Sequence, residues 1–121
     1  MSTTVAEFYH AGREQLDLQV VQGEEYLGRV IPEPALNRPG LALAGFFQYF
    51  ANKRIQVMGL AELTYLKSLQ PEEREERIKQ FFQTHIPAVA VTRGRKVPRG
   101  VLKCSEEMHV PILKTSQITM N

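Results

Sequence analysis

The segment AVAVT, from Ala88 to Thr92, is the part of the sequence that most directly indicates the fold. It is an unbroken apolar run of strand length, which is typical of a β-strand that is covered on both faces. Pro87 separates it from a helical pattern upstream, and a cationic loop, TRGRKVPRG, follows it. We therefore predict a buried strand here, in a sheet with helices packed against it.

Helical and extended patterns alternate on both sides of this strand. The predicted elements are a strand over Arg54–Gly59, helices over Ala61–Leu69 and from Pro71, a helix over Val101–His109 and a strand over Val110–Leu113. Such alternation implies parallel strands that are joined by right-handed crossovers. We predict one domain over residues 1–121, a three-layer α/β/α fold with a mixed, mainly parallel sheet of about four or five strands.

The N-terminal part has a different pattern. Thr4 and Glu7 have the spacing of a capping box, which predicts a short helix that stops near Gly12. Two short strands are expected next, over Leu16–Val21 and Tyr26–Ile31, and this pair would add an antiparallel edge to the sheet.

The most apolar stretch is LNRPGLALAGFFQYF, from Leu36 to Phe50. Pro39 suits the first position of a helix because it has no N–H group to lose. The spacing of Leu43, Phe46, Phe47 and Phe50 puts them on one helical face. We expect a buried helix over Leu41–Phe50, with Phe47 and Phe50 in the core.

Composition excludes several classes of protein. The chain has 121 residues, 43% of them hydrophobic, and a formal net charge of +2, so it is neither a disordered chain nor a strongly basic nucleic-acid binder. Neither a signal peptide nor an apolar run of about 20 residues is present, which argues against a membrane protein. Cys104 is the single cysteine, which favours a reducing, cytoplasmic setting, and we interpret it as a small core residue.

The usual catalytic and cofactor motifs are missing. The sequence contains no Gly-x-x-x-x-Gly-Lys-Ser/Thr phosphate loop and no Gly-x-Gly-x-x-Gly fingerprint. His10, His85 and His109 have no partner at a zinc-type spacing. We therefore predict no catalytic residue, no metal ligand and no cofactor in this chain.

Two places remain candidates for ligand binding. Asn37, Arg38 and Gly40 form a turn before the apolar stretch, where an arginine and free N–H groups would suit a phosphate or carboxylate. Thr92 and Arg93 follow the buried strand, at the end of a strand where α/β sheets bind ligands. The alternatives are structural: the first turn would only start a helix, Arg38 would pair with an internal carboxylate or carbonyl, and the second loop would simply be solvated.

Four segments together resemble a known family. LNRPGLALAGFFQYF, RIQVMGLAELTYL, IPAVAVTRG and VPILKT are similar, in this order and spacing, to the N-terminal domain of bacterial HPr kinase/phosphorylase. The resemblance implies a fold like that of the N-terminal substrate-binding domain of Mur ligases. It also implies that the full-length relatives phosphorylate and dephosphorylate a serine of HPr, a phosphocarrier of the sugar phosphotransferase system, and so regulate carbon metabolism through carbon catabolite repression.

In that family the catalytic residues, with ATP and Mg²⁺, belong to a C-terminal P-loop kinase domain, and hexamers form mainly through that domain. The present sequence ends in a polar tail, KTSQITMN, where the connection to such a domain is expected. The resemblance thus implies a non-catalytic regulatory or assembly domain whose partners are the kinase domain, HPr and further copies of the chain. The alternative is a module that senses a small anionic metabolite such as a nucleotide sugar or a phosphosugar.

Overall fold

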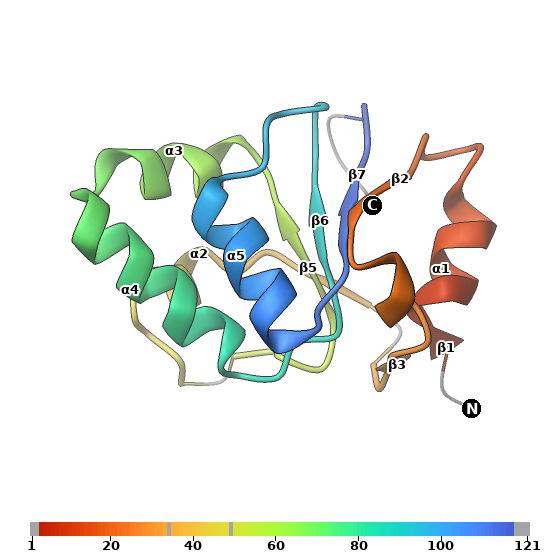
Figure 1. Cartoon of the computed structure of the whole chain (residues 1–121), viewed down its shortest axis with the longest axis horizontal. Coiled ribbons are helices and arrows are strands. Elements are labelled where there is room, and N and C mark those ends of the chain that lie inside the picture. Colours follow the sequence, from red (N-terminus) through yellow and green to blue (C-terminus); the bar gives the residue numbers. More distant parts are fainter. Residues whose placement is uncertain (1–2, 34, 49, 118–121) are drawn as a thin grey trace.

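A five-stranded sheet forms the centre of the computed structural model, which describes residues 3–33, 35–48 and 50–117 (Figure 1). Its strands are β2 (Gln19–Gln22), β7 (Ile112–Lys114), β6 (Val89–Val91), β5 (Ile55–Met58) and β4 (Leu36–Asn37), in that spatial order. The strands from β4 to β7 are parallel, and β2 is antiparallel to β7. The predicted mixed, mainly parallel sheet is therefore confirmed, with Val89 and Val91 fully buried in its middle strand.

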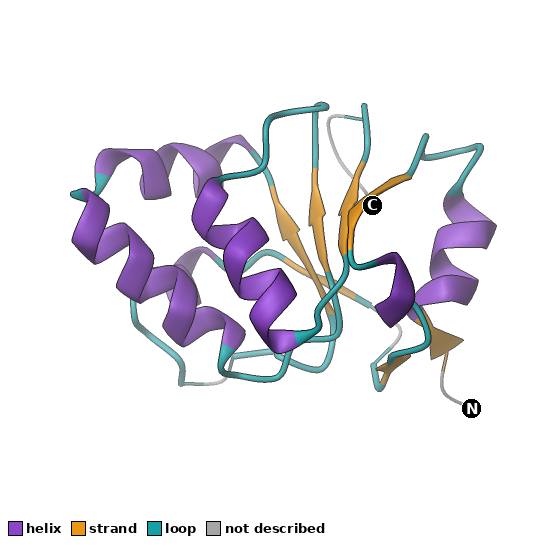
Figure 2. Ribbon diagram, in the orientation of Figure 1, coloured by secondary structure: helices purple, strands orange, loops and turns teal. Residues whose placement is uncertain are grey.

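The crossover helices all lie on one face of this sheet (Figure 2). They are α2 (Gly40–Leu43), α3 (Leu60–Ser68), α4 (Pro71–Phe82) and α5 (Arg99–Met108). Strands β4 to β7 are neighbours in the same order in space and in the chain, so successive right-handed crossovers return over the same face. The opposite face is covered by the N-terminal helix α1 (Val5–Gly12), which completes the three layers.

Each face of the sheet has its own hydrophobic core, because side chains alternate along a strand. Val89, Val91 and Ile112 pack with Phe81 and Phe82 on the crossover face. The core on the α1 face is smaller, and its buried members are Val5, Leu18, Ile31, Ile55, Val57, Ala88, Ala90 and Leu113. Within the described residues, no helix is long and apolar enough to cross a membrane.

The N-terminal predictions are partly confirmed. Thr4 and Glu7 form the capping box of α1, which ends at Gly12 as expected. The strand expected over Tyr26–Ile31 is wrong in its first half, because a 3₁₀ turn over Glu24–Tyr26 continues into a turn at Leu27 and Gly28. Only β3 (Val30–Ile31) is extended, and it pairs with β1 (Thr3–Thr4) apart from the main sheet, so β2 alone forms the antiparallel edge.

The helix expected over Leu41–Phe50 is also wrong, because α2 ends at Leu43. Gly45 has a left-handed φ of 95°, its N–H donates to Ala42 O at 2.9 Å, and the N–H of Phe46 donates to Leu41 O at 2.9 Å. These two bonds form a Schellman motif, which satisfies the last helical carbonyls and turns the chain away. Phe47 and Phe50 are consequently only partly buried against the core, and Phe46 is 51% exposed.

Candidate functional site

The two candidate ligand-binding turns lie at one edge of the sheet. Parallel strands present their carboxyl ends at the same edge. Asn37 and Arg38 stand at the end of β4, Gly59 follows β5, and Thr92 and Arg93 follow β6. Strand β5 separates β4 from β6, so the two turns are close to each other but do not adjoin.

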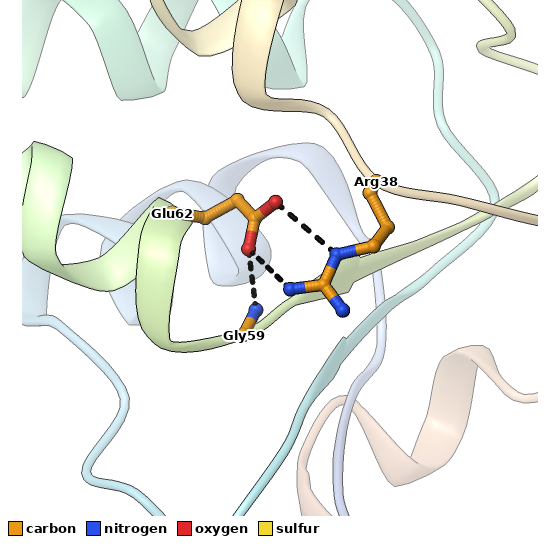
Figure 3. A network of polar contacts seen from close by, with 3 residues as sticks. All are labelled: Arg38, Gly59 and Glu62. Atoms are coloured by element: carbon orange, nitrogen blue, oxygen red, sulfur yellow. Dashed lines mark hydrogen bonds and ion pairs between the residues drawn. The ribbon is translucent and has the colours of Figure 1, made fainter. Parts of the chain in front are cut away.

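Arg38 makes the most defined polar contact at this edge, with Glu62 in the first turn of α3 (Figure 3). Its Nη2 lies 2.9 Å from Glu62 Oε1, and its Nε lies 3.4 Å from Oε2, so the guanidinium donates a hydrogen bond to each carboxylate oxygen. Glu62 Oε1 also accepts the N–H of Gly59 at 2.8 Å. The Glu62 side chain is 6% exposed and the Arg38 side chain 49%, which makes this a half-buried ion pair.

Gly59 leaves room for the close approach of Arg38. A Cβ atom built on Gly59 would overlap the guanidinium group, so with any other residue the flexible Arg38 side chain would have to shift. The contact joins the end of β4 to the junction of β5 with α3. Arg38 therefore has the internal carboxylate partner that was one of the two alternatives for it.

Asn37 and Gly40 have structural roles in the same turn. Asn37 donates its Nδ2 to Oε1 of the fully buried Gln56 at 2.7 Å, and Gln56 in turn donates to the carbonyls of Ala51 and Arg54. Gly40 is the first residue of α2, after Pro39 at the N-cap. A helix of four residues has little macrodipole, so this turn lacks the field that would attract an anion.

The second turn has few free backbone donors. The N–H groups of Arg93, Gly94 and Arg95 donate to Gln117 O at 2.9 Å, Thr115 O at 2.7 Å and Thr92 O at 3.3 Å. Thr92 is fully buried, and its Oγ1 has no hydrogen-bond partner among the described residues. Arg93 is exposed, and its backbone has a left-handed φ of 62°. This turn therefore offers an arginine but no cradle of amides, and ligand binding by either turn stays a prediction.

The sheet also lacks the crevice that binds ligands in doubly wound folds. Such a crevice opens where neighbouring crossovers leave for opposite faces of a parallel sheet. Here the crossovers between β4 and β7 share one face, so the carboxyl ends of the parallel strands are not parted. Within the described residues, no group of three His, Cys, Asp or Glu side chains is placed to hold a metal ion.

Two partners of the candidate residues were missed by the sequence reasoning. Glu62 was read only as part of a helix, although an acidic residue three positions after a strand-ending glycine is a recognisable cap. Gln56 is the single amide in the apolar run RIQVMG, and a polar residue in such a strand must find internal partners. Both signals were present, but the partners Arg38 and Asn37 could not be read from them.

Comparisons with known proteins agree with this architecture. The family model described as HPr Serine kinase N terminus matches residues 4–121. HPr kinase/phosphorylases of Brevibacillus brevis and of an Exiguobacterium species are each 41% identical to the chain over 106 residues. Those matches cover 88% of this chain and 34% of each relative, so the chain spans about a third of the length of the relatives that it matches.

A solved structure shares the fold at low sequence identity. It contains the CBS and DRTGG domains of the regulatory region of a Clostridium perfringens pyrophosphatase, complexed with its activator diadenosine tetraphosphate. The TM-score is 0.56 at 11% identity, over 87% of this chain and 39% of that chain. At this identity the structural similarity shows the fold alone. The family model matches nearly all of the sequence, and it shows that this chain belongs to the N-terminal domain family of HPr serine kinases.

Proposed function

We propose that this chain is a non-catalytic regulatory and assembly domain that works as part of an HPr serine kinase/phosphorylase. The observation that carries the proposal is the match to about a third of the relatives' length, under a family model described as their N terminus. The sequence also lacks a phosphate-binding loop. ATP-dependent transfer to a serine needs such a loop, Mg²⁺ ligands and a positioned base. In the proposal a C-terminal kinase domain of the same protein supplies them, together with the ATP and Mg²⁺ sites.

The contacts of Arg38 and Asn37 support a structural rather than a chemical role. Arg38, Glu62 and the N–H of Gly59 tie the ends of β4 and β5 to α3, whereas Asn37 bonds across to Gln56 near the start of β5. Catalytic groups instead face a space where a substrate can sit. The proposed partners are the kinase domain, HPr through the complete enzyme, and further copies of the chain, in the cytoplasm.

A domain exchange tests this proposal. The 106 matched residues of the Brevibacillus brevis relative are replaced by those of this chain, and the chimera is compared with a version of the relative that lacks the segment. We expect the deletion to alter assembly or the balance of kinase and phosphorylase activity, and the chimera to restore both. The isolated chain should transfer no phosphate from ATP to HPr. A chimera that behaves like the deletion, or phosphate transfer by the isolated chain, contradicts the proposal.

A further inference from the structure

A groove on the crossover face is bordered by two patches of opposite charge. It has a volume of about 1130 Å³ and lies between α3, the start of α4 and the segment that leads into α5. Apolar side chains of Leu60, Leu63, Ile78 and Val97 contribute to its lining, and Leu60 is 45% exposed. An open groove of this size with apolar lining is a candidate for protein contact.

The first patch, here called the cationic patch, consists of Arg95, Lys96, Arg99 and Lys103. All four residues are exposed, and all line the groove. Arg99 is the first residue of α5, whose first turn contains no acidic residue. Cations at a helix N-terminus are repelled by the macrodipole, so this patch gains from carboxylates supplied by another molecule.

The second patch, here called the acidic patch, consists of Glu72, Glu73, Glu75 and Glu76 in the first two turns of α4. All four are exposed, and Glu75 lines the groove. One contact joins the two patches within the chain, between Glu75 and Lys103 at 3.6 Å. Among the described residues, Arg95, Lys96, Arg99 and Glu72 form no ion pair.

The topology places the two patches at the same edge of the sheet. Helix α4 leads into the start of β6, and α5 leads from the end of β6 to the start of β7, so both helices run opposite to the strands (Figure 1). The two helices therefore lie side by side and begin at the same edge of the sheet. Consider a two-fold axis that runs parallel to both helices, just outside the surface and above the space between them. It would place the acidic patch of each copy on the cationic patch of the other.

We propose that this face binds a second copy of the chain in a two-fold symmetric dimer. The patches are complementary across that axis, as an isologous interface requires. The grooves of the two copies would face each other and cover the exposed Leu60. This inference rests on the proposed assembly role and names the surface that would perform it.

Sedimentation velocity on the isolated chain tests the dimer. We expect a monomer–dimer equilibrium between about 10 μM and 1 mM protein in low salt. The dimer fraction should fall as NaCl rises from about 50 to 500 mM, because salt screens exposed charges. A chain that stays monomeric at every concentration overturns the proposal. If inorganic phosphate also raises the melting temperature of that monomer, and does so only while Arg95 and Arg99 are present, the groove is an anion site instead.

Charge reversal tests the surface itself. Arg95→Glu/Arg99→Glu and Glu72→Lys/Glu75→Lys should each raise the dissociation constant at least about tenfold, because like charges then meet at both contacts. An equimolar mixture of the two variants should form a heterodimer, since both contacts become complementary again. The matched controls are Arg13→Glu/Lys53→Glu and Glu24→Lys/Glu25→Lys, which reverse exposed charges outside both patches and should dimerise like the wild type.

The outcomes separate this inference from the assembly role. If the reversed variants dimerise like the controls, or if their mixture does not associate, the proposed surface is wrong. Because neither measurement uses catalysis, a monomeric chain whose chimera still restores the relative's assembly would reject only this surface. A dimer that depends on both patches, with a chimera that restores nothing, would reject only the assembly role.

Discussion

Helix α4 and the segment from Leu36 to Phe50 differ in helix length and burial, and in each case their composition suggests the opposite of what the structure shows. Helix α4 is rich in charge, yet it is a continuous helix of 12 residues whose Ile78, Phe81 and Phe82 are at most 1% exposed. The other segment is the most apolar of the chain, yet it holds a helix of four residues. In it Leu41 is 71% exposed and Phe46 is 51% exposed.

The difference lies in the residues that begin and end a helix. Pro71 stands in the first turn of α4 beside Glu72 and Glu73, and the helix contains no glycine, so its apolar stripe can reach the core. In the apolar segment Gly45 stops the helix after one turn, before Phe46, Phe47 and Phe50 can share a face. Apolar spacing indicates a common face only where the backbone stays helical.

The largest expected effect comes from truncating one aromatic side chain in each region. Phe81→Ala should lower the free energy of unfolding by about 3–5 kcal/mol, because it empties a fully buried site. Phe46→Ala should change it by about 0.5 kcal/mol or less, because the side chain is half exposed. Urea denaturation of both variants measures the contrast. Equal losses would mean that Phe46 is as well packed as Phe81.

A second comparison asks what holds the apolar segment in place if its aromatic residues do not. Arg38→Ala should cost about 1.5–3 kcal/mol of unfolding free energy, because the buried carboxylate of Glu62 loses its charged partner. Arg38→Lys is the matched control, and it should recover only part of the loss, since lysine lacks the planar fork. Thermal or urea unfolding reports both values. A neutral Arg38→Ala would show that the ion pair does not anchor the segment.

The left-handed Gly45 should have a smaller effect of its own. Gly45→Ala should destabilise the chain by about 1–2 kcal/mol, because a side chain disfavours positive φ and would also overlap Arg77. Gly40→Ala is the control within the same short helix, where no atom lies within 4 Å of the added methyl, and it should stabilise by about 0.5–1 kcal/mol. Circular dichroism melting curves compare the two. A stabilising Gly45→Ala would mean that the helix continues past residue 44.

The smallest expected effect is on the reactivity of Cys104, and it tests how tightly α5 packs against the rest of the domain. Burial, followed by the nearby carboxylate of Glu107, raises the pKa of the Cys104 thiol above its ordinary value. A raised pKa leaves less thiolate at any given pH, so alkylation by iodoacetamide should be slower than for a cysteine peptide. The rate should also keep rising at pH values where the peptide has levelled off. Chain unfolded in urea should react like the peptide, and a folded chain that does so too would place Cys104 at an open surface.

The sequence by itself determined the class of fold and much of its core. The apolar run at Val89 and Val91, the alternation around it and the capping box of Thr4 and Glu7 all predicted elements that the structure contains. Cys104 was read correctly as a buried residue. These features are local, since the period of apolar residues and the chemistry of a cap can be read within about ten positions.

The tertiary structure alone decided which polar groups are still available. Arg38 and Glu62 are 24 positions apart, and Asn37 and Gln56 are 19 apart, so their pairing depends on how β4 and β5 align. The strand order sent every crossover helix to one face, and this brought the acidic start of α4 beside the cationic start of α5. No local pattern encodes such neighbours, because contacts between distant segments arise only once the strands have taken their order in the sheet.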